Sequence, residues 1–128
     1  MVDSDKFSFV EKLEYTICVL KKVEQEIISM KDEKAKKKVL QSLKKLSATI
    51  PNSPEKWELI KSCKGSKAYE LKPKPYRLGC YKHDKYILAV HMWRVQKKDS
   101  SEKRKNIEKV CSIVEEVKDE FERFVKGI

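Results

Sequence analysis

The sequence predicts an α+β domain with an N-terminal helical hairpin, a small antiparallel β-sheet and a long C-terminal helix. Three observations lead to this prediction. Apolar residues recur at three- and four-residue spacing near both ends of the chain, strand-forming residues fill its middle, and the two patterns are segregated along the sequence. With 128 residues and no long linker, residues 1–128 are expected to form a single domain.

Two amphipathic stretches predict the N-terminal hairpin. Residues 5–30 contain apolar side chains at helical spacing, without proline or glycine. After a charged cluster at residues 31–34, a second stripe runs from Val39 to Leu46 and ends before Pro51. Because the link between them is short, the two helices are expected to lie antiparallel. The first stripe consists of Phe9, Leu13, Ile17, Leu20, Val23 and Ile27.

The middle of the chain predicts the sheet. Residues 76–81 and 86–93 are rich in aromatic and aliphatic side chains, and residues 82–85 between them suit a hairpin turn. Shorter strand candidates precede them and end at the alternating lysines and prolines of residues 72–75. His83 lies in the predicted turn and is expected to be solvated.

The last part of the chain predicts a long helix. From about Ser100, apolar residues form one stripe over about seven turns, and Gly127 suits the end of the helix. This stripe is longer than a small sheet is expected to cover. The surplus would suit a second copy of the chain in a homodimer, or a groove in which a partner protein docks.

Several classes of protein are not expected. No stretch reaches the ~18 consecutive apolar residues of a membrane span. The first five residues are acidic and lack the basic region and apolar core of a secretory signal. We therefore expect a cytoplasmic protein that does not bind membranes.

The cysteines and acidic residues do not suggest a metal or a cofactor. None of the four cysteines belongs to a CxxC or CxxH pair, which disfavours a zinc site. The acidic residues are too scattered to indicate a magnesium site. Widely spaced cysteines favour buried thiols in a reducing compartment, and a disulfide between two of them is the alternative. The four are Cys18, Cys63, Cys80 and Cys111.

The positive charge is concentrated in the middle of the chain. The formal net charge is +10, and residues 51–98 hold 12 basic and 4 acidic side chains, a net charge of +8. Such a local excess favours a surface that binds a polyanion, most simply nucleic acid. The alternative is a lysine-rich surface that only keeps the protein soluble.

The same segment resembles a known group of proteins. The motifs that carry the resemblance are Tyr69-Glu70-Leu71, Tyr76-Arg77-Leu78, His91-Met92-Trp93 and Lys97-Lys98. They resemble the RelE/ParE superfamily of toxins from type II toxin–antitoxin systems, especially the HigB-like branch. The resemblance implies a RelE-like fold, cleavage of messenger RNA at the ribosome without a metal, and an acidic antitoxin protein as partner. Members of that superfamily usually begin with a strand, whereas residues 5–30 here have a helical pattern.

The resemblance also implies a set of catalytic residues. Cleavage of RNA without a metal needs a base, an acid and a cation beside the phosphate. Arg77 would hold the scissile phosphate, although it could instead pair with Glu70 or a helix carboxylate. His91 would move protons, or it is a hydrogen-bonded core histidine. Lys97 and Lys98 would neutralise phosphate, or they are merely solvated.

The strand register predicts which residues face RNA. If Tyr81 faces Tyr86 across the turn, Arg77 shares a face with both tyrosines, Met92 and Arg94, while His91 points into the core. A one-residue slip would reverse the faces. The expected RNA contacts are Lys67, Lys72, Lys74, Tyr81, Tyr86, Arg94 and Arg104. A second hypothesis is a module of the same fold that binds nucleic acid or a protein partner without catalysis.

Overall fold

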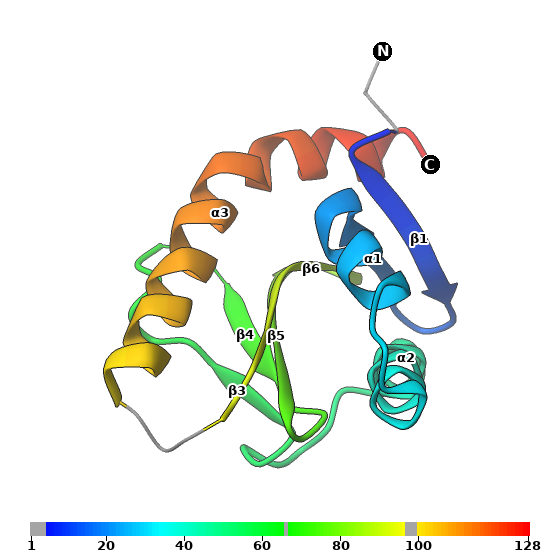
Figure 1. Ribbon diagram of the computed structural model, residues 1–128. Helices are drawn as coiled ribbons and strands as arrows, with labels where there is room; N and C mark the ends of the chain where they lie inside the picture. The colour runs from blue at the N-terminus through cyan, green and yellow to red at the C-terminus, as the bar shows by residue number, and fades with distance from the viewer. Residues whose placement is uncertain (1–4, 66, 97–99) are drawn as a thin grey trace.

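The computed structural model describes residues 5–65, 67–96 and 100–128, and within them the chain forms a six-stranded mixed sheet with three helices (Figure 1). The order across the sheet is β1-β2-β6-β5-β4-β3, with β2 parallel to β6 and every other neighbouring pair antiparallel. The elements are β1 (Phe7–Lys12), β2 (Thr16–Leu20), α1 (Lys21–Ile28), α2 (Glu33–Ala48), β3 (Trp57–Leu59), β4 (Ala68–Leu71), β5 (Tyr76–His83), β6 (Tyr86–Arg94) and α3 (Ser100–Lys126).

The predicted N-terminal helical hairpin is wrong, and so is the expectation of a purely antiparallel sheet. Residues 7–20 form the β1–β2 hairpin, and only the short α1 follows before α2. All five residues of β2 are buried, which is typical of a strand covered on both faces and gives no alternating pattern. Phe7 of β1 packs against Phe121 and Phe124 of α3, with ring centroids 5.4 and 5.0 Å apart. Contacts with a distant helix therefore select the strand conformation.

Helix α2 agrees with its predicted stripe. Val39, Leu43 and Leu46 are buried, and the Asp32 side chain caps the helix by accepting hydrogen bonds from the backbone N–H groups of residues 34 and 35. The helix packs against β1 and β2. In Figure 1 it lies on the other side of the sheet from α3.

The long C-terminal helix is also confirmed, and it covers one face of the sheet. In Figure 1, α3 follows the sheet from the lower left to the top of the molecule. Its stripe is buried against β4, β5 and β6, and its last turns reach β1. The helix lies close to the sheet at Gly79, where a Cβ atom would lie 2.2 Å from Cγ2 of Val110. Only glycine fits this position of β5 without a shift of the helix.

The predicted β5–β6 hairpin exists, but with a different register. The turn consists of Asp84 and Lys85, and Asp84 has a φ of 52°, the left-handed conformation that a tight hairpin turn requires. Tyr81 consequently faces Leu88 rather than Tyr86.

An irregularity between Gly79 and Cys80 then reverses the predicted assignment of faces. Gly79 pairs with His91, whereas Cys80 pairs with Ala89, so β6 holds an extra residue, Val90. Beyond this bulge, His91 and Trp93 lie on the face of Arg77, and Met92 and Arg94 lie on the opposite face.

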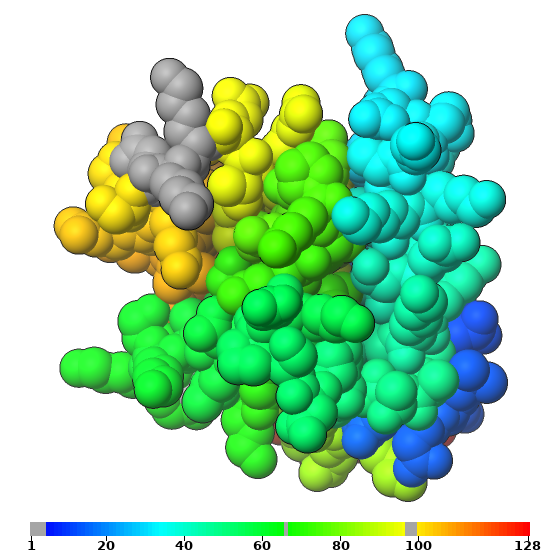
Figure 2. Space-filling view, turned by 90° about the horizontal axis from the view of Figure 1, so that it is seen from below, coloured from blue at the N-terminus to red at the C-terminus, as the bar shows by residue number. Residues whose placement is uncertain are grey.

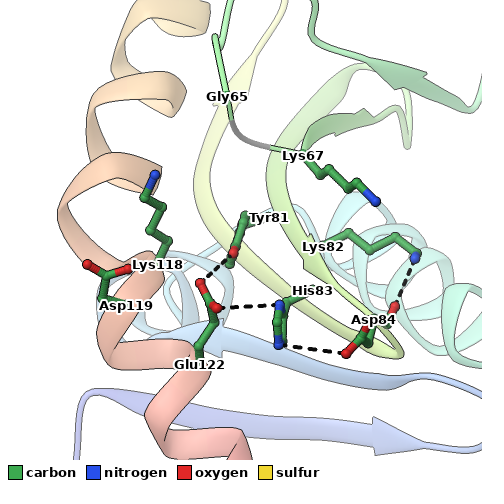
Figure 3. A pocket seen from close by; sticks show the side chains of 9 residues that line it. All are labelled: Gly65, Lys67, Tyr81, Lys82, His83, Asp84, Lys118, Asp119 and Glu122. Carbon is green, nitrogen blue, oxygen red and sulfur yellow. Dashed lines mark hydrogen bonds and ion pairs between the residues drawn. The ribbon is translucent and has the colours of Figure 1, made fainter.

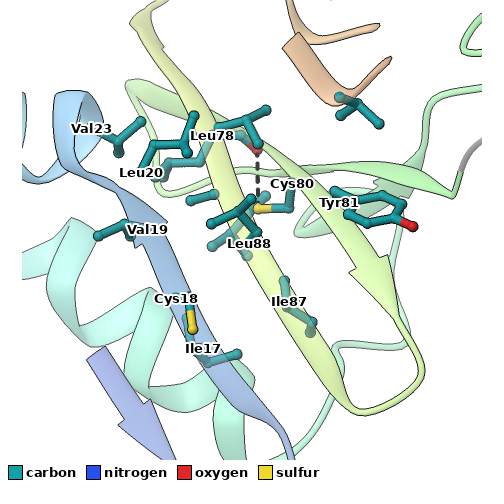
Figure 4. Close-up of a cluster of buried hydrophobic side chains, with 14 of the residues drawn as sticks. Ile17, Cys18, Val19, Leu20, Val23, Leu78, Cys80, Tyr81, Ile87 and Leu88 are labelled. Carbon is teal, nitrogen blue, oxygen red and sulfur yellow. Dashed lines mark hydrogen bonds between the residues drawn. The ribbon is translucent and has the colours of Figure 1, made fainter. Parts of the chain in front are cut away.

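The core centres on β2, β5 and β6, as Figure 4 shows. Side chains of these three strands pack together with Val23 of α1. Cys18 and Cys80 are free thiols within this core. Burial raises the pKa of the Cys18 thiol to about 12, and it also raises the pKa of the Cys80 thiol. Both are structural apolar groups rather than reactive ones.

The other two cysteines form a disulfide. Cys63 in the β3–β4 loop is bonded to Cys111 of α3, at a sequence separation of 48. The expectation of buried thiols therefore holds for Cys18 and Cys80, and the alternative of a disulfide applies to this pair. Among the described residues, none of the helices combines the length and the apolar character needed to cross a membrane.

Candidate functional site

Three strands bring together the polar residues that the sequence singled out. Glu70 of β4 pairs with Gly79 of β5, which in turn pairs with His91 of β6. Arg77, two residues before Gly79, lies opposite Trp93 on the same face. Glu70, Arg77 and His91 therefore share the face that α3 covers, at the end of the sheet where β5 begins.

Arg77 forms an ion pair with Glu70. Its Nε lies 3.5 Å from Glu70 Oε1, and the two side chains are 17% and 6% exposed. One terminal nitrogen also donates to the carbonyl of Tyr76, at 3.1 Å. The predicted alternative of a pair with Glu70 therefore applies. Since a guanidinium has five N–H groups, the partly exposed Arg77 can still donate to a second anion.

His91 is held by Asn106 of α3. His91 Nε2 lies 2.9 Å from Asn106 Oδ1, and the Asn106 amide nitrogen donates to the carbonyl of Glu102 at 3.0 Å. Because that bond fixes the amide orientation, the oxygen faces the histidine and Nε2 must carry the proton. Burial lowers the pKa of His91, which keeps the ring neutral near pH 7 with its lone pair on Nδ1. Trp93 stacks on the ring, with centroids 5.3 Å apart.

Lys72 is also paired. Its ammonium lies 2.7 Å from Glu58 Oε1 on β3, and this hydrogen bond lowers the pKa of the Glu58 carboxyl. The Lys72 side chain is only 15% exposed. The Lys72 ammonium is therefore engaged by Glu58 and is not a free cation.

Exposed cations gather beside this cluster, at the end of the sheet. Val95 donates to the carbonyl of Pro75 at 2.8 Å, which joins the loop carrying Lys74 to the end of β6 carrying Arg94. Both side chains are exposed, as is Arg104 in the first turns of α3. Figure 2 shows these segments beside one another, in light green, yellow and orange-yellow. Lys97 and Lys98 lie outside the described residues.

The other predicted contacts lie elsewhere. Tyr81 is buried and donates its hydroxyl to Glu122 of α3 at 2.9 Å. Tyr86 is half-buried and lines a shallow cavity at the β5–β6 turn with Tyr15 and Lys85. Lys67 is exposed near the other end of β5 from Arg77. These three residues do not join the cluster around Arg77.

Comparison with known proteins identifies a relative. The chain matches no family model and no solved structure. It is 39% identical, over 106 residues, to a protein of Aquifex aeolicus (strain VF5) described as an uncharacterized protein, and the match covers 75% of this chain and 73% of the relative. The chain belongs to the family of that Aquifex protein.

Membership of this family assigns no activity, so the site is interpreted from its own residues. Sequence reasoning missed Asn106, Glu58 and the residues that surround His83. Asn106 precedes the buried Val110 by one helical turn, and this spacing indicated that Asn106 faces the sheet. The partners of His83 have no such local signal, because they depend on where α3 crosses β5.

Proposed function

We propose that the protein is a toxin-like endoribonuclease that cleaves messenger RNA at the ribosome without a metal. The observation that carries the proposal is the meeting of Glu70, Arg77 and His91 from three strands, next to the exposed cations of the sheet end. A guanidinium, a neutral imidazole and neighbouring cations are the groups that such a cleavage uses. Residues far apart in sequence here converge on one face.

The proposed roles follow from the contacts. Arg77, kept in place by Glu70, donates to the scissile phosphate. His91, neutral and protonated on Nε2, takes the proton of the 2′-hydroxyl on Nδ1. Lys74 and Arg104 hold the neighbouring phosphates, and Arg94, which belongs to the opposite face, does so at the end of the sheet. The acid that protonates the leaving oxygen is Lys97 or Lys98, which stays a prediction.

Two further features support this proposal. The superfamily that the sequence resembles usually begins with a strand, and two strands precede α1 here. The exposed cations at the sheet end would suit an acidic antitoxin, which would block the same surface that RNA uses. Cleavage at the ribosome implies that the protein acts in the cytoplasm.

The test is induction of the wild type and of Arg77→Lys in the same host, followed by growth and messenger-RNA end mapping. Arg77→Lys keeps the positive charge that Glu70 needs, but it removes the planar guanidinium that can donate two parallel hydrogen bonds to a phosphate. The matched control is Arg123→Lys, at an exposed position near the C-terminal end of α3 and far in sequence from the proposed site. Arrest with new RNA ends in the wild type and the control, lost in Arg77→Lys, is the expected result. Normal growth with intact RNA in all three would reject the nuclease.

A second candidate is a module that binds nucleic acid without cleaving it. It is favoured by the fact that Arg77 and His91 already have partners, Glu70 and Asn106. Such a module would bind RNA with strong salt dependence, and Arg94→Gln would lower the slope of log K against log[salt] by about 1. Binding of this kind, together with intact RNA, would replace the first proposal by the second.

A further inference from the structure

A cavity of about 320 Å³ lies on the α3 face near the other end of β5 (Figure 3). Three segments form its walls: the loop before β4, the end of β5 with its turn, and α3. Its lining is largely polar and charged. The lining residues include Lys67, Tyr81, His83, Lys118, Asp119 and Glu122.

A histidine with a carboxylate beside it lines this cavity. Glu122 Oε2 accepts the hydrogen bond of the Tyr81 hydroxyl at 2.9 Å, and Oε1 lies 3.6 Å from His83 Nδ1. Burial and the Glu122 carboxylate raise the pKa of Tyr81, which therefore stays a proton donor to Glu122. The Glu122 carboxylate thus lies beside His83 Nδ1, just beyond hydrogen-bond distance. His83 Nε2 then faces the cavity side, 3.8 Å from Asp84 Oδ2, beyond hydrogen-bond distance.

The charges left for a ligand are positive. Glu122 is engaged by Tyr81 and His83, and Figure 3 shows the Asp119 carboxylate directed away from both. Lys67 and Lys118 stand on different walls, and Lys118 also contacts Glu115 at 3.2 Å. Among the described residues, no carboxylate is found within ion-pair distance of Lys67. Lys67 is therefore a donor available to an anion, next to the His83 imidazole.

We propose that this cavity binds a phosphate group, either of a free nucleotide or of an RNA end. Lys67 and Lys118 supply charge from two walls, and the His83 imidazole offers a ring N–H as a further hydrogen-bond donor. The volume admits a phosphate with part of its sugar. This site is separate from Arg77. The proposal that it binds phosphate does not depend on whether the protein cleaves RNA.

The disulfide connects two of the walls. Cys63 belongs to the loop that supplies Gly65 and Lys67, and Cys111 belongs to the helix that supplies Lys118 and Glu122. The bond therefore limits how far the loop can move from α3. Such a covalent tie keeps the distance between the two lysine-bearing walls fixed before the anion binds.

The test is NMR titration of the full chain, following the imidazole nitrogens of His83, with inorganic phosphate, adenosine monophosphate and a short RNA that carries a 5′-phosphate or a 5′-hydroxyl. Phosphate should shift the His83 signals, and Lys67→Gln should weaken binding about tenfold. Lys64→Gln, an exposed lysine of the same loop outside the cavity, is the matched control and should bind like the wild type.

Comparing the RNA ligands with adenosine monophosphate shows whether the bound phosphate belongs to an RNA end or to a free nucleotide. Tighter binding of the 5′-phosphorylated RNA than of the monophosphate identifies an RNA end, and equal binding identifies the phosphate of a free nucleotide. Unchanged His83 signals at millimolar phosphate would overturn the proposal. So would equal losses in Lys67→Gln and Lys64→Gln, because they would show only non-specific attraction. Arg77→Lys should leave this titration unchanged, so failure of the nuclease proposal does not affect it.

Discussion

Arg77 Nε lies 3.5 Å from Glu70 Oε1, with both side chains largely covered by the sheet and α3. A carboxylate this deeply buried needs its counter-charge, since the low-dielectric interior solvates it poorly. The same guanidinium that the proposed chemistry uses is thus also part of the fold. Loss of activity in a variant without the positive charge would not by itself identify a catalytic residue.

This pair predicts a measurable coupling. Arg77→Met should destabilise the protein by about 3 kcal/mol, because it leaves the Glu70 carboxylate buried without a partner. Glu70→Gln in the same chain should recover most of that loss. Urea unfolding of the two single variants and the double variant gives the coupling energy. Purely additive effects would show that the two side chains do not stabilise each other.

Gly79 and Val110 predict a steric coupling between sheet and helix. A Cβ at Gly79 would lie 2.2 Å from Val110 Cγ2, so Gly79→Ala should cost about 2 to 3 kcal/mol through overpacking. Val110→Ala removes the clashing methyl groups, and the double variant should be more stable than the sum of the single costs predicts. Thermal or urea unfolding checks this. If the two costs simply add, α3 does not pack on β5 at this point.

The disulfide predicts sensitivity to reductant. A bond between residues at a sequence separation of 48 should stabilise the fold by about 4 kcal/mol, if it acts by lowering the entropy of the unfolded chain. Unfolding with and without a reducing agent measures this, and a variant with Ser at both 63 and 111 is the control that reductant should not affect. Equal stability of the oxidised and reduced wild type would contradict it.

Sequence patterns predicted the elements whose partners are local. The stripes of α2 and α3 and the β5–β6 hairpin were all recognisable, because each has a clear period or turn. The strand β2 was not, since Ile17 and Cys18 are buried on opposite faces and leave no alternation. Phe7 took part in no recognisable pattern because its partners lie more than 110 residues away.

The site was predicted in part for the same reason. Arg77 and His91 were both singled out, but the extra residue Val90, which places them on one face, has no sequence signature. Of the observed partners, the sequence allowed only Glu70 to be named, as the partner of Arg77 on the next strand. His83 was expected to be solvated, and its pairing with Glu122 depends on the path of α3 over the sheet.

His91 predicts a dependence of stability on pH. Burial lowers its pKa below the value of about 6.5 in an unfolded chain, so the unfolded state binds a proton first as the pH falls. Stability should therefore decrease as the pH falls below 6.5. The charged groups facing the ring are Lys109 of α3 and Glu26 and Lys22 of α1, and Asn106 holds Nε2.

The variant His91→Gln isolates this effect. The glutamine amide can still donate to Asn106 Oδ1, but it does not titrate. The difference in unfolding free energy between pH 7.5 and 5.5 should be smaller in this variant than in the wild type, while His83→Gln serves as the histidine control. The lowered pKa of Glu58 acts only below about 4.5 and does not enter this window. If the wild type and His91→Gln lost the same free energy over that range, the buried imidazole would not be the titrating group, and the neutral base at Nδ1 would lose its support.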